Sequence, residues 1–321
     1  MKYPIDRKER VLLGGMKQTI HIWGTKPENP VVLFLHGGPG VPNRHGMAVR
    51  HMDLLDDFTI VAWDQRGTGG SYFGCDPETL TLEQLISDCA QLLEHLCKVL
   101  NKKKIFLLGA SRGTELGTFV CLRHPELVAG YIGYGQVVNG VENENVSYAY
   151  TLDQAKKAGC QEDIAKLEQI GPPVKGQYKP VFEGLMAQRK LLKKYGGHST
   201  KSGGYFKGTV LPILKSPELS IRDKIGTAKG YKLCLSRMWP TIVDYDFMGS
   251  RFQVPYYIFQ GRKDQNTPAS LIQAYYDSIQ APDKDLVWFE NSAHGPMGEE
   301  PEKFKKLMRE KLLTIAAEVQ A

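Results

Sequence analysis

The chain has 321 residues, of which 42% are hydrophobic and 24% charged, and it carries a formal net charge of +6. Its length fits one large domain, or a core with one inserted segment, and its composition is that of an ordinary globular protein. The sequence has no apolar run long enough to cross a membrane, and it lacks the basic segments interleaved with aromatic residues that indicate a nucleic-acid-binding protein.

The first 138 residues alternate strand and helix patterns. Residues 10–14 and 18–23 predict a hairpin with Gly14 and Gly15 in its turn. Further on, continuous apolar runs predict buried strands, and an apolar repeat at helical spacing predicts a long helix with Thr81 as its N-cap. The expected strands are 31–35, 58–63, 104–108 and 127–134, and the expected helices are 82–100 and 114–123. This alternation favours a mostly parallel sheet with right-handed crossovers.

The pattern changes between residues 139 and 250. Helices are expected at 148–158, 162–170 and 181–195, with no continuous apolar strand among them. Strand patterns return at 255–260 and 285–289, and helices are expected at 270–279 and 301–317. We therefore expect an α/β core built from residues 1–138 and 251–321, with residues 139–250 inserted as a helical cap.

The predicted cap is basic. It holds 17 lysines and arginines against 11 aspartates and glutamates, so its net charge equals that of the whole chain. Such a surface is either a solvated face or a source of attraction for anionic substrates.

The central motif is Gly109-Ala110-Ser111-Arg112-Gly113. By itself the pattern Gly-x-Ser-x-Gly is a weak signal in a chain with 33 glycines. Here it follows a predicted buried strand and precedes a predicted helix, which is the setting of a nucleophile elbow. The sharp turn strains the serine backbone and requires small residues two positions away on each side. Ser111 is therefore the candidate nucleophile.

A serine hydroxyl needs a base to become a good nucleophile. In the fold with this elbow, an acid and a histidine follow the serine in that order, each in a loop after a later strand. Asp264 follows the expected strand 255–260, and His294 follows the strand 285–289. We expect His294 to accept the serine proton and Asp264 to set the tautomer of the imidazole. Asp244 and Asp246 are alternative acids, although they precede the last core strands.

Two backbone amides are expected to form the oxyanion hole. One belongs to Arg112, the residue after the nucleophile, and the other to the glycine-rich loop at residues 36–40. Within this loop we favour the amide of Gly38, whereas His36 is expected to orient the loop through hydrogen bonds.

Five motifs together resemble the proline iminopeptidase-like branch of the α/β hydrolases. They are HGGPG at 36–40, DQRGTGGS at 64–71, the elbow at 109–113, GRKD at 261–264, and His294 ahead of EEPEKF at 299–304. The resemblance covers about residues 10–138 and 251–318. It implies an α/β-hydrolase fold with a helical cap, no metal, and a short peptide, amide or ester as substrate. It also implies structural roles for Asp64 and Arg66.

Two features depart from that branch. Its elbow usually carries a tryptophan after the nucleophile, whereas this chain has Arg112, which either places a charge beside the site or pairs with Glu115. An aminopeptidase of this branch also holds the substrate ammonium with carboxylates in its cap. The candidates here are Glu142 and Glu144, and Trp239 is the candidate pocket wall. The other cap aromatics (Tyr148, Tyr150, Tyr205, Phe206 and Tyr245) are expected mainly in the cap core.

The sequence thus favours a serine hydrolase that acts through an acyl-enzyme and is aminopeptidase-like. A carboxylesterase or lactone hydrolase is the alternative, and a non-catalytic binding protein with this fold is a further one. Six scattered cysteines favour free thiols, and residues 1–10 hold no apolar signal region, so we expect a cytoplasmic protein. We expect no cofactor and no nucleic-acid or membrane partner, and the oligomeric state stays open.

Overall fold

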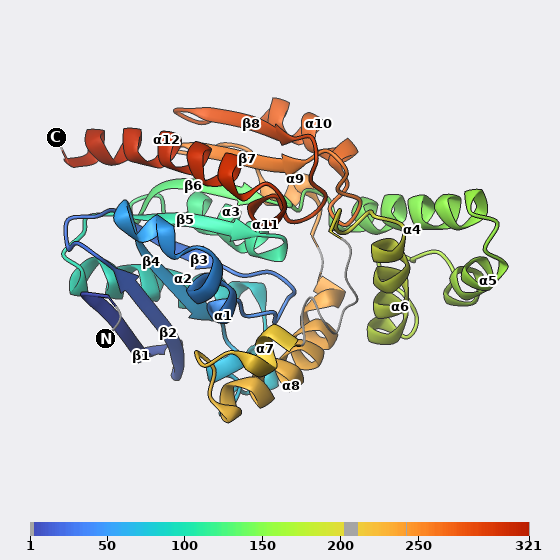
Figure 1. Ribbon diagram of the computed structural model, residues 1–321, viewed down its shortest axis with the longest axis horizontal. Coiled ribbons are helices and arrows are strands. Elements are labelled where there is room, and N and C mark those ends of the chain that lie inside the picture. The colour runs from blue at the N-terminus through green and yellow to red at the C-terminus, as the bar shows by residue number, and fades with distance from the viewer. Residues whose placement is uncertain (1–2, 202–210, 242, 321) are drawn as a thin grey trace.

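A computed structural model describes residues 3–201, 211–241 and 243–320. It contains an eight-stranded sheet with the order β1-β2-β4-β3-β5-β6-β7-β8 (Figure 1). The strands are β1 (Ile5–Leu13), β2 (Met16–Gly24), β3 (Val31–Leu35), β4 (Thr59–Asp64), β5 (Ile105–Ala110), β6 (Val128–Tyr134), β7 (Tyr256–Gly261) and β8 (Lys284–Phe289). The β1–β2 and β2–β4 pairs are antiparallel, and all other pairs are parallel. The predicted α/β-hydrolase fold is thereby confirmed.

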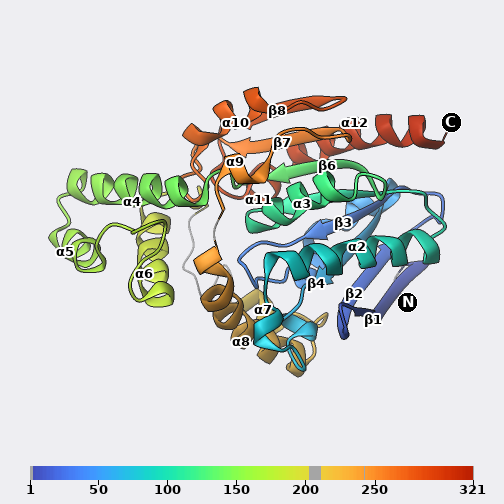
Figure 2. The same ribbon diagram turned by 180° about the vertical axis from the view of Figure 1, so that it is seen from behind.

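Helices cover both faces of the sheet, which explains why the parallel strands are continuous apolar runs. In β5, Ile105 and Leu107 pack into the core on one face, while Phe106 and Leu108 pack on the other. The first face is covered by α2 (Leu82–Val99), α3 (Arg112–Arg123) and α10 (Ile272–Ser278), and the second by α1 (Arg44–Arg50) and α12 (Pro301–Gln320) (Figures 1 and 2). The short α11 (Pro296–Glu299) precedes α12.

Local patterns in the sequence predicted most of the core strands and helices correctly. The predicted hairpin is present, with strands that extend farther on both sides of Gly14 and Gly15. The hydroxyl of Thr81 accepts a hydrogen bond of 3.1 Å from the backbone N–H of Gln84, so its predicted capping role is confirmed. The short helix α1 was not predicted.

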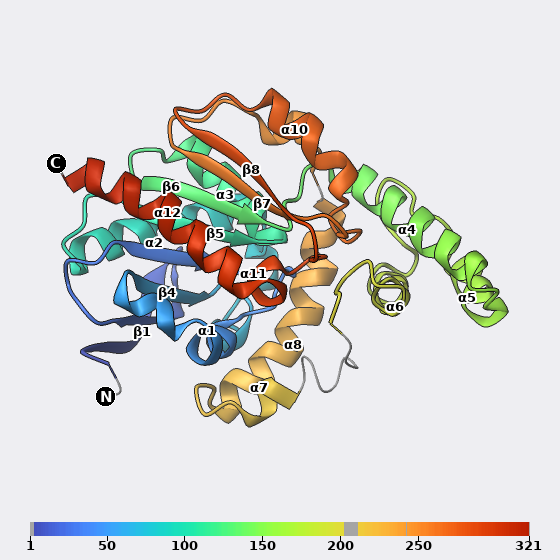
Figure 3. The same cartoon turned by 45° about the horizontal axis from the view of Figure 1, so that its top comes forward.

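Between β6 and β7 the described residues form helices. They are α4 (Gly140–Lys157), α5 (Gln161–Ile170), α6 (Val181–Lys194), α7 (Leu211–Lys215), α8 (Ile221–Met238) and α9 (Tyr245–Met248). Helices α4 to α6 extend away from one end of the sheet, whereas α7 and α8 lie beside the core (Figures 1 and 3). Tyr148, Leu167, Leu185 and Trp239 belong to an apolar cluster separate from the two core clusters. This arrangement supports our proposal of a cap over residues 139–250.

Helix α8 was not predicted, and its glycines explain why. Gly226 and Gly230 lower helix propensity in the middle of the segment. In the structure they allow α8 to lie directly on the loop after β4, because a Cβ at Gly226 would be 2.0 Å from the carbonyl oxygen of Gly69. At Gly230 the corresponding distance to the carbonyl oxygen of Gly67 would be 2.4 Å. The missed signal was the capping box formed by Ser220 and Asp223.

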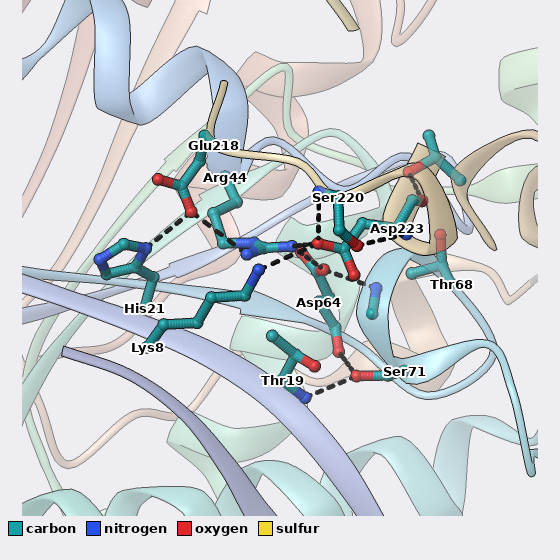
Figure 4. A network of polar contacts seen from close by, with 12 residues as sticks. Lys8, Thr19, His21, Arg44, Asp64, Thr68, Ser71, Glu218, Ser220 and Asp223 are labelled. Carbon is teal, nitrogen blue, oxygen red and sulfur yellow. Dashed lines mark hydrogen bonds and ion pairs between the residues drawn. The ribbon is translucent and has the colours of Figure 1, made fainter. Parts of the chain in front are cut away.

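A buried ionic network joins the region of α7 and α8 to the core (Figure 4). The fully buried guanidinium of Arg44 lies 3.0 Å from carboxylate oxygens of both Asp64 and Asp223 and 3.2 Å from Glu218. His21 of β2 is a further partner of Glu218, at 2.7 Å. Because Glu218 and Asp223 flank the start of α8, these contacts hold that end of the helix against β2 and β4.

The structural roles implied for Asp64 and Arg66 agree with their contacts. Asp64 accepts a hydrogen bond of 2.8 Å from the backbone N–H of Gly70, which shapes the loop after β4. Arg66 makes a two-pronged contact with Asp88 of α2, at 2.8 and 2.9 Å.

All six cysteines are free thiols, as predicted. In the part of the chain that the structure describes, none of the helices is both long enough and apolar enough to span a membrane.

Candidate active site

Ser111 occupies a sharp turn between β5 and α3. Its backbone has φ 52° and ψ −129°, a conformation that residues with a side chain rarely adopt. The turn depends on the close approach of its neighbours, since a Cβ at Gly113 would lie 2.1 Å from the carbonyl oxygen of Leu35. The N–H of Ser111 donates a 2.9 Å hydrogen bond to the carbonyl of Tyr134, which ties the turn to the end of β6. This is the geometry of a nucleophile elbow.

Asp264 and His294 meet at the ends of β7 and β8. Nδ1 of His294 lies 2.9 Å from Oδ2 of Asp264. Asp264 is fully buried and also accepts hydrogen bonds from the side chains of Gln260 and Thr267 and from the backbone N–H groups of Asn266 and Thr267. Burial alone would raise the pKa of Asp264, but His294 and the two donors of Thr267 lower it overall. The ionised carboxylate therefore requires a proton on Nδ1 of His294.

The other ring nitrogen of His294 has a partner that the sequence analysis missed. Nδ2 of Asn266 lies 3.0 Å from Nε2 of His294. With Nδ1 protonated, neutral His294 presents a lone pair at Nε2, which accepts a hydrogen from the Asn266 amide. Among the described residues, no hydrogen bond joins Nε2 to Ser111. The only available signal was the position of Asn266, two residues after the predicted acid.

A second histidine, also missed, lies beside His294. The ring of His198 is 5.3 Å from that of His294, and its carbonyl accepts a 3.2 Å hydrogen bond from the His294 backbone N–H. Burial lowers the pKa of His198 to about 3, so its ring stays neutral near pH 7. The adjacent carbonyl of Gly197 accepts a hydrogen bond from the N–H of Gln265. The segment after α6 thus contacts the loops of both the acid and the base.

The glycine-rich loop after β3 lies against the elbow. A Cβ at Gly37 would be 2.7 Å from the Cβ of Ser111 and 3.3 Å from the backbone nitrogen of Arg112. His36 orients the loop as predicted, because Nδ1 binds the carbonyl of Gly37 and Nε2 accepts a hydrogen bond from the backbone N–H of Gln65. Burial lowers the pKa of His36, which suits this neutral, accepting role. The amides of Gly38 and Arg112 stay the predicted oxyanion donors.

Arg112 forms the predicted ion pair with Glu115, with 2.9 Å between Nη2 and Oε2. Burial raises the pKa of Glu115, while Arg112 acts in the opposite direction. The guanidinium also lies 5.4 Å from the centre of the Trp239 ring. Trp239 is nearly buried, and Arg189 lies 5.9 Å from the same ring.

The predicted cap carboxylates differ in position. Glu142 is exposed and accepts a hydrogen bond from Asn145, so the structure does not bring it to this site. Glu144 is buried and pairs with Arg189, and its Oε2 has no hydrogen-bond partner among the described residues. Asp244, the alternative acid, caps α9.

Of the aromatics expected in the cap core, Tyr148 belongs to the separate apolar cluster of this region. Tyr245 does not, because it is exposed and its ring lies against Tyr275 of α10. Tyr205 and Phe206 lie outside the described residues.

Comparisons with known proteins show the family of this chain. The alpha/beta hydrolase fold family matches residues 30–158. The probable aminopeptidase YbaC of Bacillus subtilis is 30% identical over 308 residues, which cover 94% of this chain and 95% of that protein. A proline iminopeptidase of Lactobacillus acidophilus is 26% identical over 294 residues, which cover 87% of this chain and 89% of that protein.

Solved structures show the same fold at lower identity. The crystal structure of VinJ superposes with a TM-score of 0.68 at 22% identity, covering 97% of this chain and 100% of that chain. The crystal structure of a proline iminopeptidase of Mycobacterium smegmatis superposes with a TM-score of 0.66 at 17% identity. The match covers 97% of this chain and 99% of that chain. From its fold and its relatives, this chain belongs to the α/β-hydrolase family, in its proline iminopeptidase-like branch, and is a hydrolase.

Proposed function

We propose that this hydrolase cleaves a peptide, amide or ester bond of a small substrate through an acyl-enzyme on Ser111. The 2.9 Å contact between His294 and Asp264 is the observation that carries the proposal. It leaves Nε2 of His294 as the proton acceptor at the edge of the sheet where the elbow lies. The strained backbone of Ser111 supports its role as nucleophile.

The proposed reaction has two stages. The oxygen of Ser111 attacks the substrate carbonyl while its proton passes to Nε2 of His294, and the amides of Gly38 and Arg112 stabilise the oxyanion. His294 then gives that proton to the leaving group, and the bond to the leaving group breaks. Water attacks the resulting ester with the same proton transfers, which releases the acid and restores Ser111. Asp264 keeps Nδ1 protonated and stabilises the transient imidazolium.

An aminopeptidase-like substrate is the first choice, because the relatives from Bacillus subtilis and Lactobacillus acidophilus are named as peptidases of this type. Glu144 would bind the ammonium of such a substrate through its unpaired Oε2. A chain of contacts links it to the elbow, since Arg189 pairs with Glu144 and faces Trp239, which also contacts Arg112. Trp239 would form the pocket wall.

A carboxylesterase or lactone hydrolase is the second candidate. Arg189 already neutralises Glu144, so the buried carboxylate offers less attraction to an ammonium than an unpaired one would. The guanidinium groups of Arg112 and Arg189 around Trp239 favour a neutral or acidic substrate instead.

Rate assays of the parent and Ser111→Ala on matched substrates test both candidates. Alanyl- and prolyl-p-nitroanilide would be compared with p-nitrophenyl acetate and butyrate, and with N-acetylalanyl-p-nitroanilide, which has no ammonium. We expect the parent to hydrolyse the two anilides that have a free ammonium group. In Ser111→Ala the rate should fall at least about 10³-fold. Ser270→Ala changes an exposed serine and should show no comparable loss. Turnover of esters alone would favour the esterase, and no Ser111-dependent turnover would contradict the proposal.

A further inference from the structure

Two buried polar atoms close to the base have no hydrogen-bond partner among the described residues. They are Oδ1 of Asn266 and Nδ1 of His198. Asn266 is in direct contact with Nε2 of His294, and the His198 ring is 5.3 Å from the His294 ring. Buried polar groups in folded proteins are almost always paired, so these unpaired atoms beside the proposed base are available to bind a substrate group.

The backbone of Asn266 is fixed on both sides of its Cα. Its backbone N–H donates a 2.8 Å hydrogen bond to Asp264, and its backbone carbonyl accepts one of 2.6 Å from the side chain of Asn143. The lone pair on Nε2 of His294 requires the NH₂ group of Asn266 to face it, and Oδ1 is therefore the atom left unpaired. Asp264, His294 and Ser111 do not use this oxygen.

In the proposed reaction, Oδ1 of Asn266 can accept a hydrogen bond from the leaving group. Once Nε2 has taken the proton of Ser111, it no longer offers a lone pair to the Asn266 amide, and a rotation of the carboxamide can turn Oδ1 toward the leaving group. In the tetrahedral intermediate of an amide, the leaving nitrogen accepts the proton from Nε2 with its lone pair. Its own N–H then loses contact with water and needs another acceptor. The leaving oxygen of an ester carries no such hydrogen.

We propose that Asn266 is a catalytic residue whose Oδ1 accepts the N–H of the leaving group and thereby favours amides over esters. The inference rests on the proposed serine mechanism. The leaving-group side of the site accordingly takes a primary amine, released from an amide whose nitrogen carries a hydrogen. A leaving group whose nitrogen has no hydrogen gains nothing from Asn266.

The test compares the parent with Asn266→Leu, which keeps a similar shape and removes the acceptor. Three substrates that share the alanyl group and differ in the leaving group are used. They are alanyl-p-nitroanilide, alanyl-N-methyl-p-nitroanilide and alanine methyl ester. The parameter is kcat/KM, because it contains only the steps through acylation and is independent of the later attack of water. Asn143→Ala is the control, since it removes a hydrogen bond to the Asn266 backbone and keeps the carboxamide.

We expect Asn266→Leu to lower kcat/KM about tenfold for the anilide, the effect of one hydrogen bond in the transition state. The values for the N-methylanilide and the ester should change less than about twofold, because neither leaving group has an N–H to donate. Asn143→Ala should leave the anilide-to-ester ratio unchanged. An equal change for all three substrates in Asn266→Leu would overturn the role of Asn266. If the parent hydrolyses none of them in a Ser111-dependent way, the proposed function fails instead.

Discussion

The guanidinium of Arg112 lies 5.4 Å from the centre of the Trp239 ring, so the residue after the candidate nucleophile contacts the C-terminal end of helix α8. The same guanidinium pairs with the buried Glu115 at 2.9 Å. Arg189 of α6 lies 5.9 Å from the centre of the same ring. Cations from α3 and from α6 thus share one aromatic ring, an arrangement that couples the elbow to the proposed cap.

The pair of Arg112 and Glu115 predicts a large stability effect that a second substitution reverses. Arg112→Met leaves a buried carboxylate without its cation, and we expect the free energy of unfolding to fall by about 3 kcal/mol. In Arg112→Met/Glu115→Met both charges are gone, and the loss relative to the parent should be under about 1 kcal/mol. Urea unfolding at pH 7 measures both values. A double variant no more stable than Arg112→Met would contradict the prediction.

Asp264→Asn is expected to lower kcat on the order of 10⁴-fold with little change in KM. An asparagine cannot hold Nδ1 of His294 in the protonated tautomer as the carboxylate does at 2.9 Å. Steady-state kinetics on the best substrate measures the effect. Asp244→Asn is the matched control, because asparagine also caps helices and Asp244 serves as the N-cap of α9. Equal losses in the two variants would exclude Asp264 as the acid of the triad.

The packing of α8 predicts that a normally favourable substitution is harmful. Alanine is a better helix former than glycine, but a Cβ at Gly226 would lie 2.0 Å from the carbonyl oxygen of Gly69. We expect Gly226→Ala to lower the free energy of unfolding by about 2 kcal/mol. At Gly298 a Cβ would meet no atom within 4 Å, so Gly298→Ala should be neutral or stabilising. Thermal unfolding of both variants decides the matter, and a stabilised Gly226→Ala would show that α8 does not pack in this way.

His51 predicts a loss of stability in mild acid. Burial, together with the charge of Lys305, lowers the pKa of His51 from 6.5 to about 4. As the pH falls below 6.5, the unfolded chain binds a proton that the folded protein does not bind until the pH approaches 4, so stability falls across this window. Between pH 7 and pH 5 the parent should lose about 2 kcal/mol more than His51→Phe, as measured by urea unfolding. Equal losses in the two proteins would show that His51 has the same pKa in the folded protein as in the unfolded chain.

The sequence by itself determined the α/β core and the candidate triad. The core strands are continuous apolar runs because both faces of a parallel sheet are covered, and this property is visible locally. Ser111, Asp264 and His294 were identified because each follows a predicted strand, in the order that the elbow requires. The capping of α2 by Thr81 could also be predicted from the sequence, because the donor and the acceptor lie only three residues apart along the chain.

Only the tertiary structure decided which groups surround these residues. Asn266 and His198 are ordinary polar residues in the sequence, and they reach His294 because two loops and the segment after α6 meet there. Glu144 was a candidate anchor by position, but its pairing with Arg189, 45 residues away, sets its charge environment. Contacts of this kind depend on several competing partners brought together by distant elements, whereas periodicity and motif spacing report only on neighbours along the chain.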